Sequence, residues 1–186
     1  MSAAGGKIAT TGLRHPTRLE ENFLRQCLEF PGAIHHVNRL LSYQKQSEVS
    51  AADFGRAEDK ALLAIIVERA TMPTVAPIAE LCDSLDSVLA QRVKTLLTLT
   101  PTPGNKLERL PEALALSVLD WRLEKIREYN TILKQLLPSG GQAGSDDELT
   151  QSYLAQVPEM ERIHQARDAL SMTGQRRAKE SRAAKK

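Results

Sequence analysis

The chain has little of what membrane insertion, secretion or disulfide bonding would require. Its 186 residues contain two cysteines and no apolar run close to the roughly 20 residues that a membrane helix needs. The first residues carry one lysine and no apolar core, so we expect no signal peptide. Cys27 and Cys82 lie on the apolar faces of predicted helices, which favours buried free thiols and a cytoplasmic location.

The usual patterns for metal and nucleotide chemistry are also missing. Zinc sites use close pairs of Cys and His, whereas the two cysteines are far apart in the sequence and the adjacent His35 and His36 cannot point together from a helix. No glycine-rich loop ends in Gly-Lys-Ser/Thr before a helix. The acidic pair Asp146-Asp147 is explained by the positive end of a helix. We therefore expect no catalytic residue, no metal and no cofactor.

What the chain does contain favours an all-α fold. Hydrophobic residues make up 41% and charged residues 26%, but aromatic residues only 4%. Leu and Ala dominate the apolar part, and Glu, Arg and Lys the charged part, and all of these residues are good helix formers. No segment shows the alternation of apolar and polar residues that is typical of a strand.

Residues 16–110 are predicted to form a helical bundle. A capping box at Thr17–Glu20 indicates the start of the first helix. A second, short helix covers residues 34–41. The helix after Arg56 is apolar on most sides beyond Lys60, so we expect it to be central and buried. An amphipathic helix over residues 85–97 completes the bundle.

Residues 111–173 are predicted to form a long helix and an antiparallel helical hairpin. The long helix begins near Leu107 and ends at Pro138, and it carries two apolar stripes. One stripe has heptad spacing and consists of Leu116, Leu119, Leu123, Ile126, Asn130, Leu133 and Leu137. The other consists of Leu114, Val118, Trp121, Tyr129, Ile132 and Leu136. Because the helix has two apolar faces, it must contact neighbours on two sides.

The ends of the chain are predicted to be disordered: residues 1–15 as a linker and residues 174–186 as a basic tail. A glycine-rich turn and a capping box at Ser145–Glu148 precede the last helix, which Pro158 should kink or split. Gln175–Lys186 contains six basic side chains and one acidic side chain, a net charge of +5. The remaining 19 basic and 22 acidic side chains make the body mildly acidic.

The tip of the hairpin is the predicted partner-binding site, formed by Ile132, Leu136, Leu149 and Tyr153. The heptad stripe should pack against the last helix, which leaves Ile132 and Leu136 without an evident neighbour. Leu149 and Tyr153 lie level with them across the hairpin. Apolar surface left over in this way is typical of a protein interface. The alternative is that both stripes belong to the core.

Two segments resemble the C-terminal helicase-binding domain of bacterial DnaG-type primases. Residues 19–31 (LEENFLRQCLEFP) resemble its opening helix, and residues 53–63 (DFGRAEDKALL) resemble a segment in which an acidic-Phe pair precedes a helix. With the long helix and hairpin, the resemblance covers roughly residues 17–173. It implies a domain that docks through its hairpin on the N-terminal domains of the hexameric DnaB-type replicative helicase and so couples primer synthesis to unwinding.

A full primase of this family also has a zinc-binding domain and a polymerase domain, and this chain has neither. We therefore expect that it is not an enzyme and makes no primers. Two alternatives stay open. The helicase's own N-terminal domain has a similar helical bundle, and the basic tail would suit a small nucleic-acid-binding protein, since clustered Lys and Arg neutralise phosphates. No membrane or small-molecule partner is expected.

Overall fold

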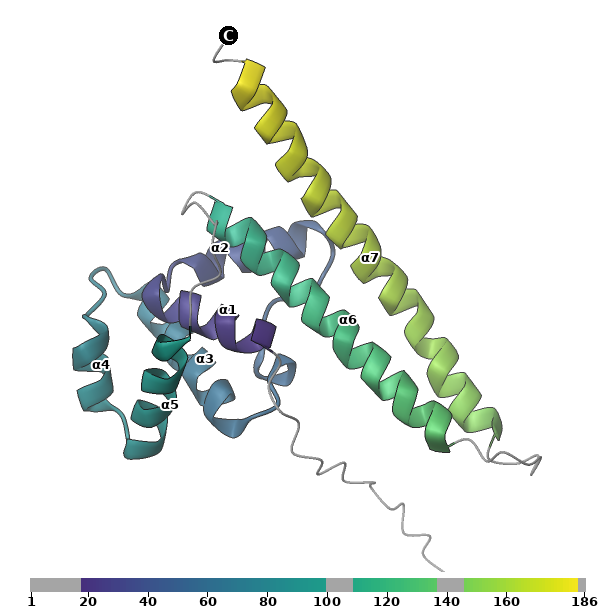
Figure 1. Cartoon of the computed structure of the whole chain (residues 1–186), viewed down its shortest axis with the longest axis horizontal. Helices are drawn as coiled ribbons and strands as arrows, with labels where there is room; N and C mark the ends of the chain where they lie inside the picture. Colours follow the sequence, from purple (N-terminus) through teal and green to yellow (C-terminus); the bar gives the residue numbers. More distant parts are fainter. Residues whose placement is uncertain (1–17, 100–108, 137–145, 184–186) are drawn as a thin grey trace, which may run out of the picture.

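A computed structural model describes residues 18–99, 109–136 and 146–183 of the chain (Figure 1). The expected all-α fold is confirmed, because helices make up most of these residues and no strand occurs among them. Thr17, the predicted linker at residues 1–15 and the predicted turn at residues 138–145 lie outside the described residues.

Helices α1 (Arg18–Glu29) and α2 (Ala33–Tyr43) form the first part of the bundle. The apolar side of α1 is fully buried and consists of Phe23, Leu24, Cys27 and Leu28. The turn between the two helices consists of Pro31 and Gly32, and it is closed by the backbone N–H of Ala33, which donates to the Phe30 carbonyl at 3.0 Å. The sequence pattern therefore predicted both helices close to their observed limits.

The rest of the bundle consists of a short 3₁₀ turn, η1 (Ala51–Asp53), and helices α3 (Ala57–Thr71), α4 (Ile78–Ser84) and α5 (Ser87–Thr98). The prediction that α3 is buried on most sides is wrong. Leu62 and Ile66 are fully buried, but Val67 is 39% exposed, so α3 has one face in the core and one outside it. The separate helix α4 was not predicted, because its seven residues are too few to show a clear period.

Helices α6 (Leu110–Leu136) and α7 (Asp146–Ala183) lie side by side and run antiparallel (Figure 1). The first half of α6 crosses α1 and α2, and its second half projects beyond the bundle together with the start of α7. The other end of α7 projects past the beginning of α6 (Figure 1). The long helix therefore contacts α1 and α2 as well as α7.

Helix α7 differs from the prediction at two places. It continues through Pro158 without a break, and the carbonyl that loses its helical partner there belongs to the exposed Leu154, where water can reach it. It also extends to Ala183, so residues 174–183 are helical and not disordered. This segment has little apolar surface, but its Arg, Lys, Glu and Ala residues have high helix propensity, which favours a helix even without burial.

Candidate protein-interaction face

Trp121 and its aromatic neighbours hold the first half of α6 on the bundle. The Trp121 side chain is fully buried. Its ring makes an edge-to-face contact with the Phe23 ring, with ring centroids 5.1 Å apart and an angle of 83° between the ring planes. Phe54 lies 5.7 Å from the same indole ring. Aromatic pairs in such geometry add about 0.5–1.5 kcal/mol beyond the apolar area that they bury. α6 therefore cannot leave the bundle without opening its core.

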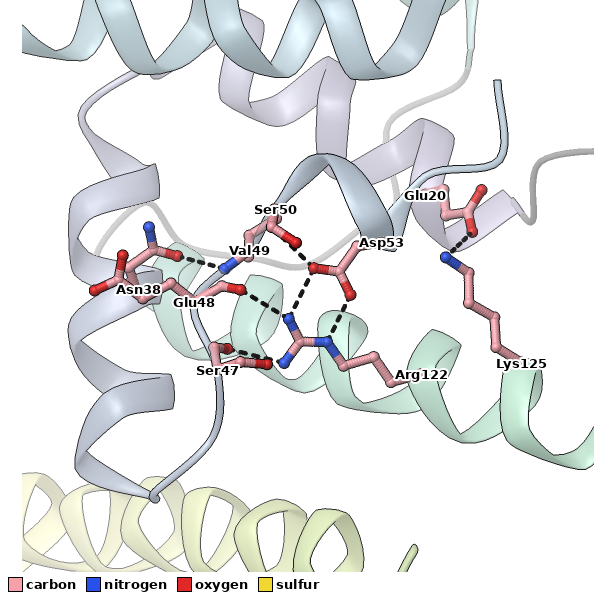
Figure 2. A network of polar contacts seen from close by, with 9 residues as sticks. All are labelled: Glu20, Asn38, Ser47, Glu48, Val49, Ser50, Asp53, Arg122 and Lys125. Atoms are coloured by element: carbon pink, nitrogen blue, oxygen red, sulfur yellow. Dashed lines mark hydrogen bonds and ion pairs between the residues drawn. The ribbon is translucent and has the colours of Figure 1, made fainter. Parts of the chain in front are cut away.

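Arg122, the next residue on α6, binds the loop between α2 and α3 (Figure 2). Its Nε and Nη2 donate to the two carboxylate oxygens of Asp53 at 2.7 and 2.8 Å. Nη1 and Nη2 also donate to the carbonyl oxygens of Ser47 and Glu48, at 2.9 and 3.0 Å. A planar guanidinium suits this arrangement because it donates along several directions at once.

The loop is shaped to present Asp53 to Arg122. The backbone N–H of Ser50 donates to an Asp53 carboxylate oxygen at 2.9 Å, as part of the capping box of η1. Asn38 of α2 accepts from the Val49 backbone N–H at 3.0 Å and holds the loop from the other side (Figure 2). The pair Asp53-Phe54, which the sequence singled out, therefore fixes α6 through its carboxylate and its ring.

The ion pair between Lys125 and Glu20 marks the point where α6 leaves α1. Lys125 Nζ lies 3.6 Å from Glu20 Oε1, which belongs to the first turn of α1 (Figure 2). Trp121, Lys125, Tyr129 and Ile132 follow one another at intervals of three or four residues and so share one side of the helix. Trp121 is fully buried, but Tyr129 is 44% exposed and Ile132 is 45% exposed. The apolar side of α6 therefore continues beyond the bundle that covers it.

The opposite side of the same segment packs against α7. Leu123 and Leu133 of α6 are buried, as are Ile163 and Leu170 of α7. Asn130, the polar member of the heptad stripe, is 7% exposed, and its amide nitrogen lies 3.8 Å from Met160 Sδ. α7 thus covers the heptad stripe and leaves Tyr129 and Ile132 half exposed.

The outcome differs among the four predicted partner-binding residues. Ile132 is half exposed, as expected for a residue outside the core. Tyr153 is half-buried and engaged in a contact, so its ring is less available than the sequence suggested. The side chains of Leu136 and Leu149 lie outside the described part of the chain, although both backbones are helical.

Two exposed apolar side chains near the tip were missed. Tyr129 lies beside Ile132 on the same side of α6, and its hydroxyl is 3.5 Å from the Ser152 hydroxyl of α7. Tyr129 belongs to the second apolar stripe of the long helix, so the spacing of apolar residues could have identified it. Leu154 is 57% exposed on the side of α7 that faces away from α6. We define the interaction face as Tyr129 and Ile132.

Other kinds of site find little support in the described residues. No group of three or more His, Cys, Asp or Glu side chains there could hold a metal ion. None of the helices in those segments is long and apolar enough to cross a bilayer. Burial raises the pKa of the Cys27 thiol well above its usual range, so this side chain is a core residue and not a nucleophile.

Comparison with protein families, curated proteins and solved structures found no match to this chain.

Proposed function

We propose that the chain is the helicase-binding domain of a replication primase, a cytoplasmic protein-interaction module that binds the N-terminal domains of a DnaB-type helicase. The observation that carries the proposal is the half-exposed pair Tyr129 and Ile132 on a helix that is firmly fixed to a bundle. The resemblance of residues 19–31 and 53–63 to that family names the partner. Primer synthesis would then reside in other domains.

The rigidity of α6 supports a role in docking. A surface that is ordered before binding loses less conformational entropy when a partner covers it. Trp121 and Arg122 anchor the helix two turns before the exposed pair, through the aromatic cluster and the bidentate pair with Asp53. Tyr is also among the residues that most often dominate the energy of protein interfaces. A hairpin held in this way can present its tip without folding on contact.

The test is a calorimetric titration of the isolated N-terminal domains of the helicase with the full chain. We expect saturable binding that changes little between about 50 and 200 mM salt, because the contact is apolar. A small nucleic-acid-binding protein would behave differently. Its affinity for DNA would fall steeply over that range, since bound phosphates release counterions. Absence of helicase binding together with salt-sensitive DNA binding would overturn the proposal.

The other alternative is a fragment related to the helicase's own N-terminal domain. Such a fragment should associate with itself, because those domains pack against one another in a hexamer. Sedimentation of the chain alone distinguishes this fragment from a helicase-binding domain. A helicase-binding domain should not form an oligomer that blocks its binding to the helicase. A stable oligomer that does not bind the helicase would favour the alternative. Template-directed RNA synthesis by the purified chain would contradict the non-catalytic role.

A further inference from the structure

A second surface feature lies at the opposite end of α6 from the interaction face. It is a groove of about 810 Å³ between the α1–α2 turn, the segment that links α3 to α4, and the start of α6. Leu110 at this end and Ile132 are separated by about 33 Å along the helix, at 1.5 Å per residue. The groove is therefore independent of the proposed helicase contact.

The walls of the groove are mainly apolar. Phe30 and Val75 line the groove and are 42% and 43% exposed. Leu28 and Leu110 also line it and are buried. The charged or titratable side chains that line it are Glu29, His36 and Arg69. A single inorganic ion would leave most of such a volume and its apolar walls unused, so the lining favours a peptide.

Arg69 is the unusual residue in this groove. It is 5% exposed, and its Nη2 donates to the Ala76 carbonyl at 2.6 Å and its Nη1 to the Leu28 carbonyl at 3.4 Å. No carboxylate among the described residues pairs with it. Burial lowers the pKa of its guanidinium, which reflects the cost of a buried cation. The two carbonyls use two of the five N–H donors of the side chain.

Carboxylates pair with the other two buried arginines, Arg25 and Arg92, and with the largely buried Arg122. Arg92 contacts Asp59 at 2.8 Å, and Arg122 contacts Asp53 at 2.7 Å. Arg25 contacts Glu29 at 2.9 Å, so the acidic group that lines the groove is already neutralised. His36 Nδ1 lies 2.8 Å from an Arg39 nitrogen, from which it accepts a hydrogen bond. Among the buried arginines of the described residues, Arg69 therefore differs in having no carboxylate partner.

We propose that this groove binds an acidic segment of a partner protein, with a carboxylate side chain paired to Arg69 and an adjacent apolar side chain packed between Phe30 and Val75. The carboxylate would complete the pairing that the other buried arginines already have. Charge-assisted hydrogen bonds of this kind are the stronger ones, and Arg69 is already desolvated in the folded chain, so a carboxylate beside it is attracted more strongly than it would be beside an exposed cation.

The probe is the peptide Ac-Ala-Asp-Leu-Phe-Ala-NH₂, titrated into the ¹⁵N-labelled full chain, with a twin that carries Asn in place of Asp. We expect the Asp peptide to shift the backbone amides of Gly32, Val75 and Ala76 and to bind about tenfold more tightly than the twin. Equal binding of the two peptides would overturn the charge pairing. Absence of shifts at millimolar peptide would overturn the site.

Two variants test the residues involved. In Arg69→Gln, the ratio of the affinities for the Asp peptide and the Asn peptide should fall to near one. Arg69 also joins the end of α1 to the segment between α3 and α4, so this variant is expected to be less stable, and Val75→Glu provides an independent test. It places a carboxylate in the lining of the groove, where it competes for Arg69, and should weaken the Asp peptide about tenfold or more. Val88→Glu, at a 59% exposed position on α5, is the matched control and should bind like the parent. Unchanged affinity in Val75→Glu would contradict the proposal.

Discussion

Asp59 and Arg92 form the most deeply buried ion pair among the described residues. Asp59 is fully buried, and its two carboxylate oxygens accept from Arg92 Nε and Nη2 at 2.8 and 3.0 Å. Removing one partner leaves a buried charge without compensation. We predict that Asp59→Ala lowers the free energy of unfolding by about 3–5 kcal/mol in urea titrations.

Glu21 provides a control on the same arginine. It accepts from Arg92 Nη1 at 3.0 Å, but its side chain is 21% exposed. Glu21→Ala leaves the Asp59 pair intact and should cost about 1 kcal/mol or less. Similar losses in the two variants would show that burial does not determine the strength of this network.

Cys27 makes the free energy of unfolding depend on pH, and comparison with the variant Cys27→Ala isolates this contribution. Burial raises its pKa in the folded chain above the ordinary value of 9.0. As the pH rises through that ordinary value, the unfolded chain loses the thiol proton and the folded chain keeps it, so unfolding becomes easier. By pH 10 the parent should lose about 1–2 kcal/mol more of its free energy of unfolding than Cys27→Ala does. Parallel curves for the two proteins between pH 8 and pH 10 would contradict this prediction.

At the scale of elements, the end of α7 makes a clear contrast with the rest of the chain. Residues 175–183 are helical, yet the sequence from Gln175 to Lys186 has no apolar residue larger than Ala. Such a segment can bury little surface in the core. We predict that deleting residues 175–186 changes the melting temperature by less than about 5 °C. A larger fall in a calorimetric scan would show that this end packs on the body.

Helix positions could be predicted from the sequence more readily than the contacts between helices. The spacing of Phe23 and Cys27 places α1, and the two stripes of α6 indicate that it has neighbours on two sides. The partners of Arg92 and Arg122 lie 33 and 69 residues away, and nothing local distinguishes Asp59 or Asp53 from other acids. Such pairings depend on how the helices cross, which periodicity does not specify.

The candidate site, like the fold, could be predicted from the sequence only in part. The excess apolar surface on α6 could be predicted, because one helix cannot cover two stripes, and Tyr129 and Ile132 are indeed half exposed. The assignment of Tyr153 to that surface relied on its level along the hairpin. Its half-buried position depends on the rotation of α7 about its own axis, which the stripe on α7 defined only loosely.

At the scale of the whole molecule, the features proposed for binding are separated. The interaction face of Tyr129 and Ile132 lies beyond the bundle at one end of α6, and the Arg69 groove lies at the other end. The aromatic cluster around Trp121 lies between them. Since these features share no residue, substitutions at one should affect the other only slightly. We therefore expect a helicase contact that can be removed without loss of the fold.

The most direct test of this expectation is the double variant Tyr129→Ser/Ile132→Ser, measured for helicase affinity and for unfolding on the same sample. We expect affinity for the helicase N-terminal domains to fall by about 2 kcal/mol or more. The free energy of unfolding should fall by at most about 1 kcal/mol, because Tyr129 and Ile132 are already half exposed.

Two controls frame this measurement. Val88→Ser, on the exposed side of α5, should bind like the parent, and Leu119→Ala, at a fully buried position, should lose about 2–5 kcal/mol of folding free energy. We expect weakened binding by a double variant that is as well folded as Val88→Ser. A double variant that binds the helicase as tightly as the parent, or that unfolds as readily as Leu119→Ala, would show that Tyr129 and Ile132 are not the helicase contact.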